Sequence, residues 1–348
     1  MIPKGLYPSH HLWGADMLNS DEYNLKIVPH KGNTSLNLLA KLVSSFLRYR
    51  FGDFDQELEV WRMRNEIDIL YVADGNLFFI LILHLIGLYR PKIVRWRYTP
   101  RKIFEWWKFR ELSNTSFLFR GTDLLLCLTH RATRAYKLEM NFLDVMQLDW
   151  GVDTKLFTPG KRDGNFFFAC GKTNRDYSSL VLQAHLINGP IHLVIHESFL
   201  EGFDLPANVH VGDGTQDLQN DRGISYPLLL KRYFHKALAL LIPLKTSDDD
   251  SAGMTNLLEA MACGLPVVMT RSGALDINIE DLGIGIYVDP SDSNGWASAC
   301  NWLLENPAKA RAMGDRGRHL SLSHYNTQRL GSELSKIFKK LCSPSQKV

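Results

Sequence analysis

The feature that most constrains the fold of this 348-residue chain is a regular alternation of short apolar segments with segments of helical periodicity. Predicted strands lie at 25–28, 67–74, 92–98, 123–128, 145–151, 166–171, 191–196, 209–212, 238–244, 266–270 and 285–289, and predicted helices lie between most of them. Strands separated by helices at this spacing form right-handed βαβ units and therefore parallel sheets. The sequence predicts an α/β protein.

The alternation is interrupted once, at 153–165, where proline, glycine and mixed charges predict a linker. We therefore expect two doubly wound Rossmann-like domains facing a cleft, at 1–155 and 156–322. A C-terminal helix at 323–348 is long enough to cross back to the first domain. Ligands of such sheets bind beyond the carboxyl ends of the strands, so the cleft is the expected binding place.

The bulk composition excludes several classes of protein. A net charge of +3 is too small to indicate nucleic acid, and the five cysteines form no C-x-x-C pair. This spacing argues against a disulfide framework or a zinc site and fits a reducing cytosol. The segment 76–89 is the most apolar in the chain but falls short of the ~20 residues of a spanning helix. It predicts either a buried helix or a segment that dips into a membrane.

One charge interrupts the apolar sequence "SAGMTNLLEAMACGLPVV" at 251–268, and that charge is Glu259. Gly253 permits close approach of the backbone, and Thr255 or Asn256 can cap the helix that follows. The free amides of the first turn form an anion site. A carboxylate in this turn can accept two hydroxyls, as a ribose presents them, or it can simply be a glutamate favoured by the helix dipole.

This segment resembles the donor-site signature of GT-B-fold retaining glycosyltransferases of the family 4 type, the glycosyl transferases group 1. Two more segments resemble the same family in the same order: "LDWGVDTKLFTPG" at 148–160 and "ACGKTNRDYSSLVLQA" at 169–184. The resemblance covers roughly residues 120–340, and the first hundred residues only by architecture. It implies that 1–155 takes the acceptor and that 156–322 binds the nucleotide sugar.

The resemblance also implies roles for individual residues. Glu259 would bind the ribose, and Lys172 and Arg175 would be catalytic cations that stabilise the leaving diphosphate without a metal ion. The other residues implied in donor binding lie in loops and at the helix start; they are Gly253, Met254, Thr255, Asn256, Asp250, Ser251, Gly171 and Gly212.

The chain departs from the family pattern at two places. The family carries a second glutamate eight positions before Glu259, where this chain has Ser251, so either Asp250 substitutes for it or the sugar is recognised differently. In addition, almost no apolar strand precedes the N-terminal loop. That loop, the end of the strand 92–98 and the start of the helix 131–140 supply the acceptor-side or cleft candidates, which are Gly14, His10, His11, Arg97 and His130.

A basic, aromatic-rich segment lies at 90–110, with eight Lys and Arg residues against Glu105 alone. Such a segment can bind anionic lipid headgroups or an anionic acceptor, or it can be a basic face over core aromatics. We expect a cytoplasmic protein that can sit peripherally on the inner face of a membrane. Nucleic acid is not expected as a partner.

These observations predict a glycosyltransferase that moves a sugar from a nucleotide-diphosphate sugar to an acceptor hydroxyl, with retention, without metal and without a bound cofactor. The expected acceptor is a glycan, a lipid-linked molecule or a small molecule. Two alternatives stay open, a non-catalytic nucleotide-sugar-binding subunit that supports a partner transferase and a GT-B sugar-nucleotide epimerase. The sequence leaves the nucleobase and the sugar undetermined.

Overall fold

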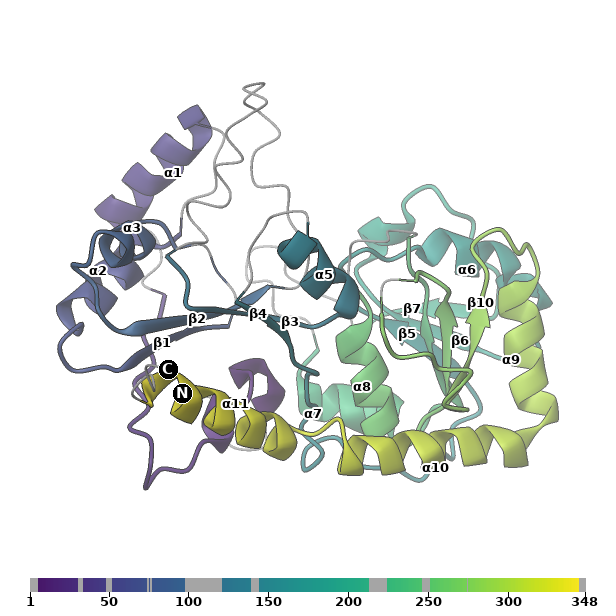
Figure 1. The fold of residues 1–348 in the computed structure, drawn as a ribbon. Coiled ribbons are helices and arrows are strands. Elements are labelled where there is room, and N and C mark those ends of the chain that lie inside the picture. The colour runs from purple at the N-terminus through teal and green to yellow at the C-terminus, as the bar shows by residue number, and fades with distance from the viewer. Residues whose placement is uncertain are drawn as a thin grey trace. The chain divides into compact units, whose positions relative to one another are not determined.

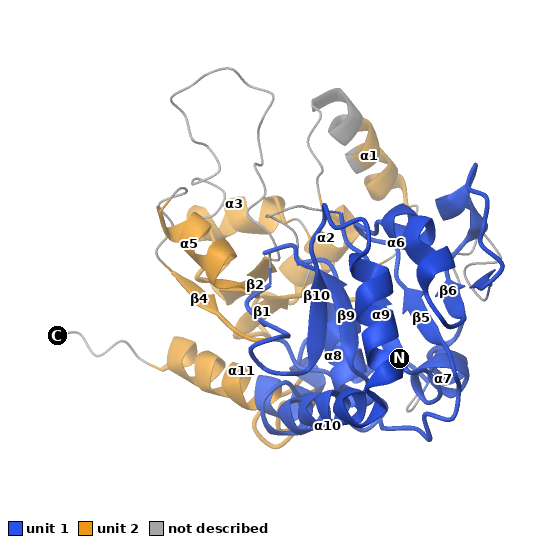
Figure 2. Cartoon of the chain, turned by 90° about the vertical axis from the view of Figure 1, so that its right-hand side faces the viewer, with its two compact units in different colours: residues 1–16, 150–330 blue, residues 17–149, 331–348 orange. Residues whose placement is uncertain are grey.

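A computed structural model describes residues 6–30, 34–47, 52–73, 75, 77–97, 121–138, 144–212, 224–245, 251–273 and 275–343. The chain divides into two compact units, coloured separately in Figure 2. Unit 1 comprises Met1–Asp16 and Trp150–Leu330, and unit 2 comprises Met17–Asp149 and Gly331–Val348. Each unit is built on its own parallel sheet.

Unit 2 contains the sheet β1-β2-β3-β4, in which all neighbours are parallel. Its strands are β1 Ile69–Val72, β2 Lys92–Arg97, β3 Leu124–Cys127 and β4 Val145–Gln147. Its described helices are α1 Ser35–Leu47, α2 Phe54–Arg62, α3 Phe79–Leu85 and α5 His130–Leu138, labelled in Figure 1. Within the apolar segment 76–89 lies α3, whose Ile80 and Leu81 are buried in a core with Tyr89 and Ile93.

The last helix, α11 (Thr327–Cys342), joins unit 2 through its C-terminal part. The Tyr23 hydroxyl lies 2.9 Å from Ser335 Oγ, and the ring of Phe338 lies 5.5 Å from that of Tyr71. Residues far apart in the sequence therefore build this unit together.

Unit 1 contains a six-stranded parallel sheet in the order β10-β9-β8-β5-β6-β7. The strands are β5 Phe167–Cys170, β6 Ile191–Val194, β7 Val209–Val211, β8 Ala239–Ile242, β9 Val267–Thr270 and β10 Gly285–Val288. The chain runs outward from β5 to β7 and then returns to β8, which pairs with β5. The order reverses between β5 and β8, and ligands of doubly wound sheets bind outside the carboxyl ends of strands at such a switch point.

Helices cover both faces of this sheet (Figure 1). The α-helices are α6 Tyr177–Gln183, α7 Tyr226–Leu229, α8 Met254–Ala262, α9 Gly295–Glu305 and α10 Pro307–Ser323. The helix α6 continues as the short 3-10 helix η3 Ala184–Leu186, and α7 continues as the π-helical segment η5 Leu230–Phe234. Successive side chains of a strand point to opposite faces. Accordingly, Phe167 packs in the core with α6 and α9, whereas the ring of Phe168 lies 5.0 Å from that of Phe234.

The N-terminal residues pack onto unit 1, and so the division differs from the predicted boundaries. The indole of Trp13 stacks on that of Trp150, with 4.7 Å between ring centroids. The Trp150 indole N–H donates to the His10 carbonyl over 3.1 Å, and the Ser9 amide donates to Asp153 over 3.0 Å. These contacts explain why residues 6–16 cluster with the second sheet.

Two further predictions fail or change in the structure, and one helix was not predicted. Residues 25–28 form no strand. The side chains of Leu25 and Ile27 are exposed, so pairing this segment with a sheet would bury little apolar surface. The helix α2 was not predicted, although Asp53 caps it by accepting the amides of Asp55 and Gln56. The segment 153–165 belongs to unit 1, and its Phe157 is fully buried, so it is not a free linker. The predicted helix 101–112 lies outside the described residues.

Within the described part of the chain, no helix combines the length and apolar character needed to cross a bilayer.

Gly151 lies against the backbone that leads into α11, where Val152 bridges Asn326. A Cβ at Gly151 would lie 2.2 Å from the Asn326 carbonyl oxygen, and backbone cannot yield as a flexible side chain does. We expect Gly151→Ala to lower the free energy of unfolding by about 2–4 kcal/mol in urea titrations. Gly189→Ala, whose Cβ would meet neighbours no closer than 3.5 Å, is the control. Equal stability of the two variants would contradict this packing.

Candidate functional site

The loops that follow β5 and β8 are joined at the switch point of unit 1. Arg175 and Leu244 form an isolated antiparallel bridge between them. The Asp176 amide donates to the Pro243 carbonyl over 3.1 Å, and the Lys245 amide donates to the Asn174 carbonyl over 3.1 Å. The carboxyl ends of the two central strands therefore carry a single connected platform.

Arg175 is buried, and its guanidinium donates hydrogen bonds to other groups of the protein. It donates to the carbonyls of Cys170 and Thr173, over 3.4 and 2.7 Å, and to Asn256 Oδ1 over 2.6 Å. Gly171 makes room for it, because a Cβ there would lie 2.7 Å from Arg175 Nη2, and its φ of +109° favours glycine. Arg175 thus ties the β5 loop to α8.

Asn256 links Arg175 to Glu259 by hydrogen bonds to both side chains. Its amide nitrogen donates to Glu259 Oε2 over 3.2 Å, while its oxygen accepts from Arg175. Both residues lie on α8, three positions apart, which places them on one helix face. The result is a hydrogen-bonded series from Arg175 through Asn256 to Glu259.

The carboxyl of Glu259 is buried, with 2% of the residue exposed, and its Oε1 has no hydrogen-bond partner. Burial raises the pKa of Glu259 to about 8, although Asn256 and the charge of Arg175 oppose the rise. His10 Nε2 lies 3.6 Å from Oε1 and also has no hydrogen-bond partner. A buried acceptor left without a donor costs about 1–3 kcal/mol, so this is an expensive arrangement for a residue that only packs.

His10 is held in one tautomer by its neighbours. Its Nδ1 accepts the amide of Asp153 over 3.3 Å, so the ring hydrogen is on Nε2. Burial and the neighbouring His11 lower the pKa of His10 well below its ordinary value of 6.5. The ring is therefore neutral at pH 7 and presents an N–H toward Glu259.

The start of α8 completes the site. Gly253 precedes the helix with a left-handed φ of +89°, and Met254 is buried while Thr255 and Ser251 are half-buried. The first-turn amides of a helix are not used by its own carbonyls, so this end of α8 can bind an anion. Asp250 lies outside the described residues.

The remaining candidates are distributed over both units. In unit 1, Lys172 is exposed on the β5 loop and Gly212 is exposed after β7. His11 Nε2 lies 3.0 Å from the Tyr226 hydroxyl. Gly14 follows Trp13 with a φ of +77°. His10, His11 and Gly14 thus lie in unit 1, although the sequence analysis assigned them to the first domain.

Arg97 and His130 belong to unit 2 and lie beyond or near the carboxyl ends of its strands. Arg97 is the buried last residue of β2, and His130 is the exposed first residue of α5. In the described part of the segment 90–110, Arg90 is exposed. Lys92 donates to Asp123 over 2.8 Å, while Arg95 and Arg97 are buried. The remainder of that segment lies outside the described residues.

Two residues of the site were not among the candidates, although a motif contained them. Asp153 accepts the Ser9 amide and donates its own amide to His10, and Trp150 holds the His10 carbonyl. Both lie in the segment 148–160, whose resemblance to the family motif is visible in the sequence and could have marked them as candidates. Its pairing with residues 9–13 depends on contacts more than 130 positions apart.

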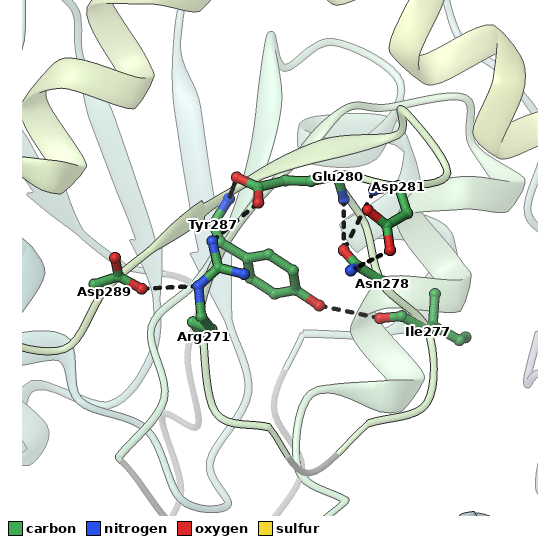
Figure 3. Close-up of polar contacts among 7 residues, drawn as sticks. All are labelled: Arg271, Ile277, Asn278, Glu280, Asp281, Tyr287 and Asp289. Atoms are coloured by element: carbon green, nitrogen blue, oxygen red, sulfur yellow. Dashed lines mark hydrogen bonds and ion pairs between the residues drawn. The ribbon is translucent and has the colours of Figure 1, made fainter.

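A second polar cluster lies beyond the carboxyl ends of β9 and β10 (Figure 3). Arg271 donates to Glu280 over 2.9 Å and to Asp289 over 2.8 Å, and it stacks on the Tyr287 ring. Asn278 caps the turn through the amide of Glu280. The positive charge of Arg271 is paired with two carboxylates, so the cluster orders the loop.

Among the described residues, no group of three or more His, Cys, Asp or Glu side chains is arranged to hold a metal ion.

Comparison with known proteins gives a family match over part of the chain and a fold over most of it. Residues 225–320 match the family model described as glycosyl transferases group 1. The chain is 39% identical over 80 residues to a GDP-mannose-dependent alpha-(1-6)-phosphatidylinositol monomannoside mannosyltransferase of Mycolicibacterium smegmatis, covering 23% of this chain and 21% of that protein. It is 38% identical over 93 residues to a D-inositol 3-phosphate glycosyltransferase of an Arthrobacter species, covering 27% and 20%. The matches therefore span about a fifth of these relatives.

Solved structures extend the likeness over most of the chain. Sucrose-phosphate synthase from Thermosynechococcus elongatus superposes with a TM-score of 0.63 at 17% identity, covering 83% of this chain and 77% of the other. Anabaena HepE in complex with UDP and glucose superposes with a TM-score of 0.60 at 15% identity, covering 90% and 86%. The predicted fold is confirmed, with two Rossmann-like units of the GT-B type.

The raised pKa of Glu259 predicts a stability that depends on pH. Between its ordinary value of 4.5 and about 8, the folded chain keeps the proton that the unfolded chain has released. The free energy of unfolding should therefore fall as pH rises through this window, by up to about 1.4 kcal/mol per pH unit. Glu259→Gln, which cannot ionise, should be more stable than the native chain at pH 8, and the gap should shrink toward pH 5.

Urea titrations from pH 5 to pH 9 measure this gap. His10 titrates in both proteins, so its own contribution cancels in the difference. Glu305→Gln, at an exposed position, serves as the control and should track the native chain. A gap that stays constant with pH would show that Glu259 is ionised in the folded chain.

Proposed function

From a GT-B chain whose residues 225–320 match the glycosyl transferases group 1 family, we propose that this protein transfers a sugar from a nucleoside-diphosphate sugar to an acceptor hydroxyl. The observation that carries the proposal is Glu259, a buried carboxyl with an unpartnered oxygen at the switch point of a doubly wound sheet. The similar proteins support the donor class, because they include a GDP-mannose-dependent enzyme and a protein solved in complex with UDP.

In the proposed complex, Glu259 accepts ribose hydroxyls and the first-turn amides of α8 bind the diphosphate. The Glu259 oxygen lacks a donor, and a ribose hydroxyl supplies one. The helix start offers amides and the positive end of its dipole to phosphate oxygens. Gly253 lets the chain enter α8 at a φ of +89° and close to the side chains of Met269 and Ile242.

The two proposed cations take different parts in this mechanism. Lys172 is exposed on the β5 loop, so its ammonium can reach the leaving diphosphate and neutralise charge that develops there. Arg175 already donates to two carbonyls and to Asn256, so we assign it to positioning Asn256 and Glu259. The proposed reaction retains the anomeric configuration, and a phosphate oxygen of the leaving group takes the proton of the attacking hydroxyl.

The acceptor is assigned to unit 2, where Arg97 and His130 lie at the carboxyl side of the sheet. A glycan or a small-molecule hydroxyl fits this proposal, as does a lipid-linked acceptor at the inner face of a membrane. Ser251 supports a second candidate function, a non-catalytic subunit that binds the nucleotide sugar. It occupies the position at which the family has its first glutamate, and its side chain has no negative charge.

A nucleotide screen tests the donor site. We expect one or more of UDP, GDP, ADP, CMP and dTDP to raise the melting temperature of the full chain. A ligand at about 100 times its Kd adds about 2.7 kcal/mol to stability. Glu259→Ala should abolish the shift, whereas the exposed Glu305→Ala should keep it. No shift with any nucleotide would reject the proposed function.

Turnover of the nucleotide sugar that carries the selected base separates the two candidate functions. Lys172→Ala should lower kcat about 100-fold without changing the melting temperature, because Lys172 is exposed. Arg175→Ala should lower the melting temperature as well, since it breaks buried hydrogen bonds. Lys231→Ala, exposed on η5, is the control. Nucleotide binding without any turnover would favour the non-catalytic subunit.

A further inference from the structure

Two buried polar atoms from distant parts of the sequence face each other in unit 1 without a hydrogen-bond partner. They are His10 Nε2 and Glu259 Oε1, which lie 3.6 Å apart. The residues are 1% and 2% exposed, so water does not satisfy them from the surface. Buried polar atoms in folded proteins almost always have a hydrogen-bond partner. Two adjacent atoms without one, here called the orphan pair, indicate that a ligand group hydrogen-bonds to both.

The chemistry of the missing group follows from the two atoms. His10 Nδ1 already accepts the Asp153 amide, so Nε2 carries the hydrogen and can only donate. Glu259 Oε2 already accepts from Asn256, and Oε1 is available to accept when the carboxyl is ionised, the form that a donating hydroxyl stabilises. One group that accepts from the histidine and donates to the carboxylate satisfies both, and a hydroxyl does this with a single oxygen.

We infer that His10 is a specificity-determining residue of the donor site, which donates from Nε2 to the same ribose hydroxyl that donates to Glu259 Oε1. The inference rests on the proposed function, because that function supplies the nucleotide. Hydrogen bonds of about 2.8 Å at the tetrahedral angle of a hydroxyl require the two atoms to lie about 4.6 Å apart. They therefore need to separate by about 1 Å to admit it.

The N-terminal segment is built to hold His10 in this orientation. The Trp150 indole fixes its carbonyl, Asp153 fixes both the Ser9 amide and the imidazole, and Trp13 stacks on Trp150. Both the donor atom and the tautomer are thus set before a ligand binds. A pre-oriented donor binds without the entropic cost of ordering a flexible side chain.

Two substitutions separate the role of Nε2 from the role of Nδ1. In His10→Asn the side-chain oxygen can replace Nδ1 and keep the bond from Asp153, while the donor toward Glu259 is lost. In His10→Gln the longer amide can place an N–H near the position of Nε2. His185→Asn, at an exposed position on η3, is the matched control. Melting temperatures of the unliganded variants report whether each chain folds.

The experiment is a calorimetric titration of each protein with the nucleoside diphosphate selected by the screen and with its 2′-deoxy and 3′-deoxy forms. We expect the native chain and His185→Asn to prefer the ribonucleotide over at least one deoxy form by about 10-fold or more. His10→Asn should lose about 10-fold in affinity for the ribonucleotide and little for that deoxy form, so that the preference disappears. His10→Gln should recover part of it.

The other outcomes overturn the inference in distinguishable ways. If the native chain binds no nucleotide, the proposed function and the inference both fail. If Glu259→Ala loses nucleotide binding but His10→Asn keeps the full ribose preference, the proposed function stands and the orphan pair holds only a buried water. If His10→Asn weakens ribo and deoxy forms equally, His10 supports the fold of the segment and does not read the hydroxyl.

Discussion

The hydrogen-bonded series from Arg175 through Asn256 to Glu259 is the interaction on which the rest of unit 1 depends. It joins the loop after β5 to the helix after β8, the two strands between which the strand order reverses. Only glycine suits position 171, because a Cβ there would lie 2.7 Å from the guanidinium and the φ is +109°. The series also orients the carboxyl so that one oxygen is held and the other is left for a ligand.

A comparison of two buried glutamates shows why this matters. Glu57 in unit 2 is as buried as Glu259, and burial raises its pKa to about 7. Its oxygens accept the amides of Phe78 and Ile80, so it caps the start of α3 and needs nothing more. Glu259 accepts one side-chain donor and leaves Oε1 unsatisfied. The same residue type is structural in one unit and, by our proposal, functional in the other, and hydrogen-bond satisfaction separates the two.

The N-terminal segment contributes a side chain to the surroundings of Glu259, although the two are far apart in the sequence. Residues 9–13 reach the β8–α8 region through Trp150 and Asp153, so the environment of Glu259 includes a histidine from the start of the chain. The unpartnered Glu259 Oε1 and His10 Nε2 together reduce stability. The stacked tryptophans and the Ser9–Asp153 hydrogen bond offset part of this cost and keep the segment in place.

The sequence by itself determined the α/β class, all the parallel strands from 67–74 onward and the donor-side motif, because strand periodicity and helix-start chemistry are local properties. It also singled out Glu259, since one charge in an apolar helix is visible without a structure. It did not determine that 25–28 forms no strand, that 153–165 packs in unit 1, or that Arg175 is buried and donates to Asn256. Only the tertiary structure decided these points and brought His10 to Glu259, because they depend on burial and on contacts between residues up to about 250 positions apart.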